Sequence, residues 1–385
     1  MAQSPYNAPR ARAAYIKPKH PTDPFHLPSP REIRFLHPGY PDDDSLLLSL
    51  PALDSPDGIH HQTALDVCAL VAGNKWDGFF TLDKDGKLRV PTDDMDASLQ
   101  GKAYYFQVPA EDSDNPGIRK DYPVVPTFTE WKFPHNTLPA RWSREPTFEL
   151  ADVRRCLLSK SISLLEIAHI IPRNMFIEKW FNDNGMLRYD GIHSNRNIMT
   201  LKVDVHQYFD HKPKFVIVQK YGKMVAHFLR CRSAEEREPV ELYHNVPVAI
   251  TEQHHCFLLT RLAWTVFPLI ELFLKKGVSR RLLRKTGEGV EIMEENAQKC
   301  IQAFLDGQPR SASPTKRARK DSGGTQDACG WGSQDASDWE TRDVSDWENQ
   351  DASEWEEQLR GRKRRRELSV RGTQHEPLYI RRIGN

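Results

Sequence analysis

The chain of 385 residues carries 54 Lys and Arg against 53 Asp and Glu, which gives a formal net charge of only +1. A balance so close to zero excludes a polycation that binds nucleic acid along its whole length, so any basic surface must be local. The hydrophobic share of 38%, together with 27 prolines, predicts a globular centre with extended flanks. Six scattered cysteines give no disulfide framework, and the amino-terminal residues hold no apolar run typical of a signal peptide. We therefore expect an intracellular protein.

The first 145 residues are predicted to form two regions. Residues 1–30 are rich in proline and basic side chains and are expected to be disordered. Residues 31–145 are expected to form an N-terminal α+β region, with a helix from about Thr63 to Val71 and a hairpin around the Asp-Gly turn at 84–87. Further strands of this region are predicted within 31–53, at 79–81 and at 102–109.

Two other features of this region carry expectations of their own. The adjacent histidines His60 and His61 invite a metal-binding interpretation, but such pairs in a polar segment before a helix are usually solvated, and we expect that here. The aromatic and proline-rich stretch 123–144 is expected to be a connector that lies over the domain surface.

Three polar residues stand out within residues 164–220, because each has apolar neighbours: His169, Asn197 and His206. The sequence LEIAHIIP predicts a short strand that stops at Pro172, since proline cannot donate to a ladder. RNIMTLKVDVHQYFD predicts a second strand that runs into a helix, and KFVIVQK a strand after it. We therefore expect a ββα hairpin, with its helix packed across it and the three polar residues converging on one point.

These residue types can support phosphodiester chemistry. An imidazole whose pKa lies near neutrality can take a proton from water, and a second imidazole can hold a divalent metal through a ring nitrogen. An asparagine can tie the hairpin together through its amide or add an oxygen to the metal. The N-x8-H spacing of Asn197 and His206, with apolar Ile198 and Leu201 between them, supports a shared site.

The surrounding frame resembles that of the HNH endonucleases, in particular the HNH domain common in filamentous-fungal proteins. The resemblance covers about a sixth of the chain and rests on the following residues: Ala168-His169-Ile170-Ile171-Pro172-Arg173, Trp180-Phe181, Asn184-Gly185-Met186, Tyr189, Asn197, Leu201, Asp204, His206, Phe209-Asp210 and Phe215-Val216-Ile217-Val218. It implies a ββα-metal nuclease core that hydrolyses DNA, with His169 as general base, Asn197 as the hairpin asparagine and His206 as a metal ligand.

The sequence departs from that family at the residue before the first histidine. Many HNH nucleases have a metal-binding Asp, Glu or His there, whereas this chain has Ala168. Glu166, on the same strand face, and Asp210, one helical turn after His206, are the candidates for the missing carboxylate. With His206 and Asn197 they form the predicted metal site, for which oxygen ligands and phosphate favour Mg²⁺ or Mn²⁺. A structural zinc is not expected, because Cys156 belongs to no CxxC pair.

Two function classes follow from this reading. In the first, the protein is a metal-dependent endonuclease, and Arg173 and Lys202 hold the phosphate backbone of DNA without reading its sequence. In the second, it is a non-catalytic nuclear module that binds DNA or protein on a degenerate HNH scaffold. Ala168 is the best argument for the second class, and the intact His169, Asn197 and His206 are the best arguments for the first.

The predicted HNH domain extends over residues 146–307, with helices at its C-terminal end. The apolar run 256–274 is long enough to span a bilayer, but it contains Arg261, Pro268 and Glu271, and we expect a buried helix that covers the hairpin, with no membrane partner. Residues 290–307 are predicted to form an amphipathic helix that ends at Gly307.

Residues 308–385 are predicted to be a disordered tail. Two basic clusters, at 314–320 and 361–366, could serve as nuclear-import signals or as non-specific nucleic-acid contacts. Between them an eight-residue repeat places four tryptophans in register, at Trp331, Trp339, Trp347 and Trp355. This repeat is interpreted either as a solvated acidic tract or as a docking segment for a protein partner.

Overall fold

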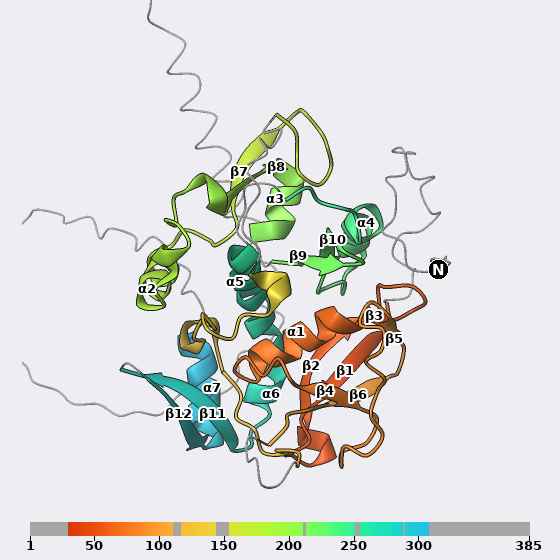
Figure 1. Ribbon diagram of the computed structural model, residues 1–385, viewed down its shortest axis with the longest axis vertical. Coiled ribbons are helices and arrows are strands. Elements are labelled where there is room, and N and C mark those ends of the chain that lie inside the picture. Colours follow the sequence, from red (N-terminus) through yellow and green to blue (C-terminus); the bar gives the residue numbers. More distant parts are fainter. Residues whose placement is uncertain are drawn as a thin grey trace, which may run out of the picture. The chain divides into compact units, whose positions relative to one another are not determined.

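The computed structural model describes residues 30–110, 117–143, 154–210, 213–250, 255–287 and 289–307. Strands and helices are mixed along the chain, which confirms the α+β class (Figure 1). The predicted disorder of both ends, the two basic clusters and the tryptophan repeat lie outside the described residues. The described residues up to Gly307 belong to one compact unit, and the predicted division at residue 145 stays a prediction.

A four-stranded sheet forms the N-terminal part in the order β2-β1-β6-β4. Strand β1 is antiparallel to β2 and parallel to β6, and β4 is antiparallel to β6. Side chains alternate on β1, so that Ile33 and Phe35 are buried while their neighbours are exposed. The four strands have these bounds: β1 Glu32–Leu36, β2 Leu46–Pro51, β4 Phe79–Thr81 and β6 Ala103–Gln107.

Helix α1 (His61–Val71) ends at the predicted residue, begins two residues before the predicted start, and is buried along nearly its whole length. Strand β3 (Ile59–His60) directly precedes it and pairs antiparallel with β5 (Ser98–Leu99), which follows β4 in the chain. The predicted hairpin is confirmed by the antiparallel pairing of Thr81 with Arg89.

The antiparallel pair β7 (Leu165–His169) and β8 (Ile198–Lys202) is followed directly by helix α3 (Val203–Asp210). This strand–strand–helix order is the predicted one. Between the strands lie α2 (Met175–Asp183), η5 (Met186–Arg188) and η6 (Asn195–Asn197). Asn174 caps α2 by accepting a hydrogen bond from the Ile177 amide. The helix stops before Gly185, whose φ of 62° lies in the left-handed region.

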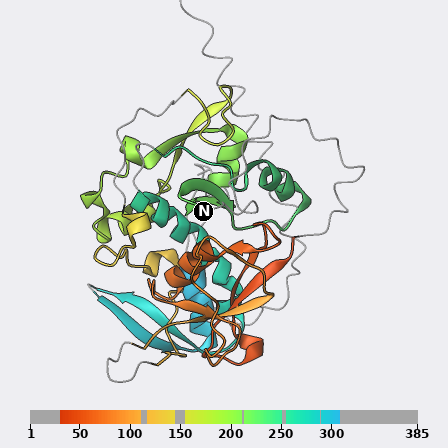
Figure 2. The same ribbon diagram turned by 45° about the vertical axis from the view of Figure 1, so that its right-hand side comes forward.

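Helix α5 (His255–Val266) lies at the centre of the unit, where it contacts α1 on one side and strand β9 on another (Figures 1 and 2). It continues through η7 (Phe267–Ile270) into α6 (Glu271–Lys275). This helical stretch is long and apolar enough to cross a membrane, but most of it is buried inside the fold. The expected buried helix is therefore observed.

The remaining elements surround this helix. Strands β9 (Phe215–Lys220) and β10 (Lys223–Phe228) pair antiparallel, and α4 (Ala234–Tyr243) follows them. At the C-terminal end β11 (Arg280–Thr286) and β12 (Gly289–Glu295) pair antiparallel, and α7 (Ala297–Asp306) packs against α6.

Two predictions about these segments are wrong. Residues 290–295 are a strand, because they pair with β11 along their whole length, and the helix starts only after Asn296, whose side chain caps it. The stretch 123–144 does not lie over the surface. Its aromatic side chains are buried, with Trp131 0% and Trp142 1% exposed. The free energy gained by removing this aromatic surface from water outweighs the cost of burying the backbone of a connecting segment.

Candidate active site and metal site

His206 lies between two carboxylates. It projects from α3, and its Nδ1 is 2.9 Å from Glu166 Oε2 on β7, while its Nε2 is 2.8 Å from Asp210 Oδ2 one turn further along α3. Both carboxylates are partly exposed. The hydrogen bond to Asp210, and then that to Glu166, raises the pKa of His206 above the ordinary histidine value. The two carboxylates thus lie at different nitrogens of one ring, so that either carboxylate, together with the ring nitrogen beside it, offers a pair of donors that suits a hard divalent cation.

His169 stands at the end of β7, where it pairs with Ile198 of β8. Its imidazole forms no hydrogen bond with the residues that the structure describes. Burial, and next the positive charge of Arg173, lower the pKa of His169, and the charges of Asp210 and His206 also act on it. A half-buried neutral imidazole without a hydrogen-bonding partner in the described chain suits a group that takes a proton from water.

Asn197 is fully buried at the start of β8, and its side chain joins three backbone groups. Its Oδ1 accepts from the Ile171 amide at 2.8 Å, and its Nδ2 donates to the carbonyls of Ile192 and Ile171 at 2.7 and 3.2 Å. In addition, the Ile170 amide donates to the Asn197 carbonyl. The residue therefore fastens the chain just after His169 to the start of β8, which fixes where the His169 imidazole stands.

One comparison decides the family. Residues 151–217 match the family model described as HNH endonuclease. These residues form a domain of the HNH endonuclease family. No curated protein and no solved structure matches the chain. An HNH domain indicates a nuclease or another nucleic-acid-related function, and it contains β7, α2, β8 and α3, the elements that carry the residues just described.

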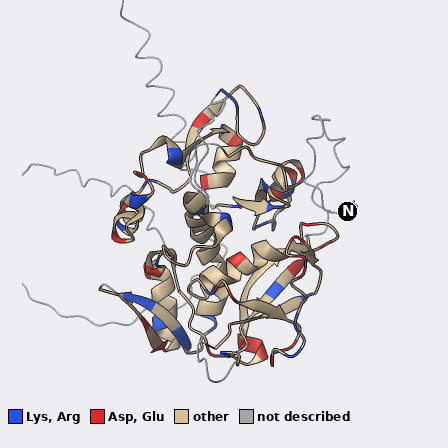
Figure 3. Ribbon diagram, in the orientation of Figure 1, with Lys and Arg blue, Asp and Glu red and all other residues tan. Residues whose placement is uncertain are grey.

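The two predicted phosphate contacts lie on the HNH domain but differ in their surroundings. Arg173 is exposed just beyond β7. Lys202, at the end of β8, is only partly exposed, and its Nζ lies 2.6 Å from Asp204 Oδ2. Acidic positions occur on β7 and α3 as well (Figure 3). Because Lys202 is paired with Asp204, Arg173 is the more available of the two cations for a phosphate group.

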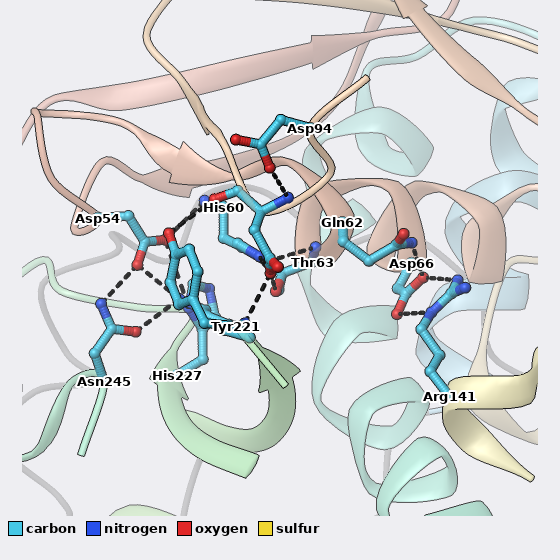
Figure 4. Close-up of polar contacts among 12 residues, drawn as sticks. Asp54, His60, Gln62, Thr63, Asp66, Asp94, Arg141, Tyr221, His227 and Asn245 are labelled. Atoms are coloured by element: carbon cyan, nitrogen blue, oxygen red, sulfur yellow. Dashed lines mark hydrogen bonds and ion pairs between the residues drawn. The ribbon is translucent and has the colours of Figure 1, made fainter. Parts of the chain in front are cut away.

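A second cluster of carboxylate and histidine side chains lies outside the HNH domain. Asp54, His227 and His244 are buried, with possible ligand atoms within 4.8 Å of one another. Asn245 donates to Asp54, and Figure 4 shows both residues with His227 near them. The ammonium of Lys220 already bonds to Asp54 Oδ1 at 2.6 Å, to His227 Nδ1 at 2.7 Å and to Asn245 Oδ1 at 2.8 Å. This buried cation takes the place that a metal ion would need, so the group is a closed salt-bridge network.

The charges of this network fit that interpretation. Burial would raise the pKa of Asp54, but the charge of Lys220 and the hydrogen bond from His244 hold it well below its usual range. Burial, and next Lys220, place the pKa of His227 well below that of an ordinary histidine, so its neutral ring can accept from the ammonium. The sequence offered one signal for this network, which is the lysine that ends β9 two residues after the apolar run 215–218.

The histidine pair His60 and His61 is not solvated as predicted, because both side chains are buried. His60 Nδ1 accepts from the Thr63 amide and so caps α1, while its Nε2 lies 2.9 Å from Asp96 Oδ1. Burial lowers the pKa of His61 to about 4. Cys156 is buried in the core, as expected for a free cysteine.

Proposed function

We propose that this protein is a metal-dependent endonuclease that hydrolyses phosphodiester bonds in DNA. The observation that carries the proposal is the cluster of Glu166, His206 and Asp210, of which Asp210 and His206 lie close enough to His169 for their charges to act on its pKa. The carboxylate that Ala168 cannot supply is thus available from two other positions. Ala168 itself is buried and contributes only to packing.

Each side chain has a proposed role. The His169 imidazole takes the proton from the attacking water, and Asn197 keeps that imidazole in place through its three backbone bonds. His206 and a carboxylate would hold a divalent cation, for which Mg²⁺ and Mn²⁺ are the proposed ions. When bound, such a cation stabilises negative charge on the phosphate and on the leaving oxygen. Arg173, and to a lesser extent Lys202, bind the phosphate backbone, which positions DNA without reading its sequence.

Nicking of supercoiled plasmid by the full chain tests this function. The measurement is made with Mg²⁺, with Mn²⁺ and with a chelator, on the wild type and on His169→Ala. We expect nicking only with metal, and a rate about 10²- to 10⁴-fold lower in the variant, because general base catalysis contributes a factor of that size. Asn195→Ala is the control, since Asn195 is an exposed polar residue of the same domain and its loss should leave the nicking rate unchanged.

Retained DNA binding without nicking under any metal would favour the second function class, a non-catalytic module on the same scaffold. Equal nicking rates in His169→Ala and the wild type would remove His169 from the proposed mechanism.

A further inference from the structure

A buried arginine reaches the candidate active site from the central helix. Arg261 lies in the middle of α5, outside the residues that match the HNH family, and its side chain is only 1% exposed. Its guanidinium carbon stands 3.6 Å from the centre of the Phe209 ring, so the charge lies over an aromatic face. Burial lowers its pKa to about 10, which still leaves it charged at neutral pH.

One nitrogen of this guanidinium touches both halves of the site. Arg261 NH1 donates to Asp210 Oδ1 at 3.1 Å and to the Ile170 carbonyl at 3.3 Å. Ile170 directly follows His169 in the chain, and Asp210 is the partner of His206. A single side chain of α5 therefore links the strand end that presents the proposed base to the helix that presents the proposed metal ligand.

Stability alone does not explain an arginine at this position. Its Nε and NH2 have no hydrogen-bond partner in the described part of the chain. A buried cation with unsatisfied donors is costly, and an apolar side chain of similar volume is often neutral or more stabilising. Because Asp210 is 39% exposed, water could solvate it if the arginine were absent, so the carboxylate does not require a buried counter-ion for folding.

The two carboxylates around His206 are held differently. Asp210 uses both oxygens, Oδ1 for Arg261 and Oδ2 for His206. Glu166 is 45% exposed, and within the described residues its carboxylate meets only His206. Asp210 is thus fixed, while Glu166 can move away from His206 Nδ1 with little loss.

We propose that Arg261 is a positioning residue of the nuclease site: by anchoring Asp210 it holds the Nε2 side of His206, which leaves Nδ1 and Glu166 to bind the divalent cation. This inference rests on the proposed function. In this assignment Asp210 supports His206, and Glu166 is a ligand of the metal. The Nε2 of the ligating histidine is then held by a carboxylate, as is usual for histidine ligands.

Arg261→Met tests the assignment in the full-length protein, with Mn²⁺ as the probe. Mn²⁺ affinity is measured by titration calorimetry without DNA, and the melting temperature is measured on the same samples without metal. We expect Mn²⁺ affinity to fall about 10- to 100-fold, the usual effect of losing such a supporting partner, while the melting temperature stays the same or rises. Arg261→Lys keeps the positive charge but loses the planar guanidinium group, and its Mn²⁺ affinity should lie between those of the wild type and Arg261→Met.

Arg280→Met provides a matched control. Arg280 is also 1% exposed and also lies over aromatic rings, 3.8 Å from Phe273 and 4.3 Å from Tyr40, and its NH1 and NH2 likewise have no partner within the described ranges. Its Nε donates to the Phe273 carbonyl, outside the HNH domain. This variant should bind Mn²⁺ as the wild type does.

The histidine nitrogens give an independent readout. In protein labelled with ¹⁵N at histidine, adding Zn²⁺ should shift His206 Nδ1 to the range of a ligated nitrogen, while Nε2 keeps its proton. A shift at Nε2 in place of Nδ1 would overturn the assignment. Unchanged Mn²⁺ affinity in Arg261→Met would also overturn it. So would a loss of Mn²⁺ affinity that is explained by a lower melting temperature of that variant.

Failure of this inference can be told from failure of the proposed function. If the wild type and Arg261→Met bind Mn²⁺ and nick plasmid equally well, while His169→Ala does not nick, the positioning role is wrong and the nuclease stands. If the wild type neither binds Mn²⁺ nor nicks plasmid, both are wrong.

Discussion

Two clusters of carboxylates and histidines in this protein use similar residues in opposite ways. In the Asp54 network the side chains of Asp54, Lys220, His227 and His244 are buried, and the ammonium of Lys220 supplies the positive charge from within the chain. In the Glu166–His206–Asp210 cluster the carboxylates are partly exposed, and the histidine stands between them. The difference shows that donor atoms alone do not define a metal site. In the second cluster Arg261 engages Asp210 but leaves Glu166 open to solvent, so access to solvent and a carboxylate without an internal cation distinguish it from the Asp54 network.

The largest effect on the contrast between the two clusters is expected when the internal cation is removed. Lys220→Met should lower the free energy of unfolding by about 4 kcal/mol, because it leaves the buried Asp54 without its counter-ion. Chemical denaturation of the metal-free protein measures the loss. The double variant Asp54→Asn, Lys220→Met removes both charges and should regain part of the stability. A single variant as stable as the wild type would show that the network does not depend on this ion pair.

The comparison also predicts that opening the network creates a metal site. In Lys220→Ala the freed space adjoins Asp54, His227 and His244, whose possible ligand atoms lie within 4.8 Å of one another. Zn²⁺ should therefore raise the melting temperature of this variant more than that of the wild type. An equal response in both proteins would mean that Lys220 is not what excludes the metal.

On the nuclease side, the largest effect is expected from Asn197. Asn197→Ala removes three hydrogen bonds to buried backbone groups and should cost about 3 kcal/mol of stability. Asn195→Ala is a suitable control, because that residue lies two positions earlier and is exposed. A loss below about 1 kcal/mol in thermal unfolding of Asn197→Ala would contradict a fastening role for the carboxamide.

The two carboxylates of the nuclease cluster should respond unequally. Glu166→Gln removes the proposed ligand and should lower Mn²⁺ affinity about 100-fold, whereas Asp210→Asn keeps an oxygen that can accept from His206 and should lower it only about tenfold. Titration calorimetry on both variants checks the order. The reverse order would make Asp210 the ligand and would remove the distinction drawn between a fixed and a movable carboxylate.

The smallest effect concerns pH. The pKa of His206 is raised above 6.5, chiefly by its hydrogen bond to Asp210, and the ligating ring must be unprotonated to bind metal. The pKa of His169 is lowered below 6.5 by burial, and the base must also be unprotonated. As the pH falls, metal binding is therefore lost before the base is protonated. At limiting Mn²⁺ the nicking rate should fall with a midpoint above 6.5, and saturating Mn²⁺ should move that midpoint below 6.5. A midpoint that Mn²⁺ does not move would contradict this order.

The sequence predicted the hairpin better than its surroundings. Strands β7, β8 and β9 and helix α3 follow from local apolar patterns, and the three polar residues within them were recognisable because an apolar frame makes a lone polar residue conspicuous. The Asp54 network was missed, since its members come from segments separated by as many as 191 positions and no local pattern joins them. Arg261 was noted only as a charge that argues against a membrane span. Its contact with Asp210 depends on how α5 packs, which periodicity does not reveal.

Strand β12 and the stretch 123–144 were misjudged for a related reason. Residues 290–295 pair with strand β11, which only the hairpin turn brings into place, and this pairing overrode the helical pattern. The aromatic stretch was expected at the surface because prolines interrupt it. Its side chains nevertheless find partners in the core, among them Trp180 of the HNH domain.

That contact has a consequence for whether the HNH segment can be separated from the rest of the chain. The Trp131 ring stacks on Trp180 with 5.4 Å between ring centres and 5° between planes, and the Trp180 indole donates to the Trp131 carbonyl at 2.7 Å. A polypeptide limited to residues 151–217 would expose this tryptophan to water and lose Arg261 as well. Residues 151–217 are therefore not expected to fold on their own. Expressed alone or grafted into another protein they should aggregate, unless the 123–144 stretch and α5 are included.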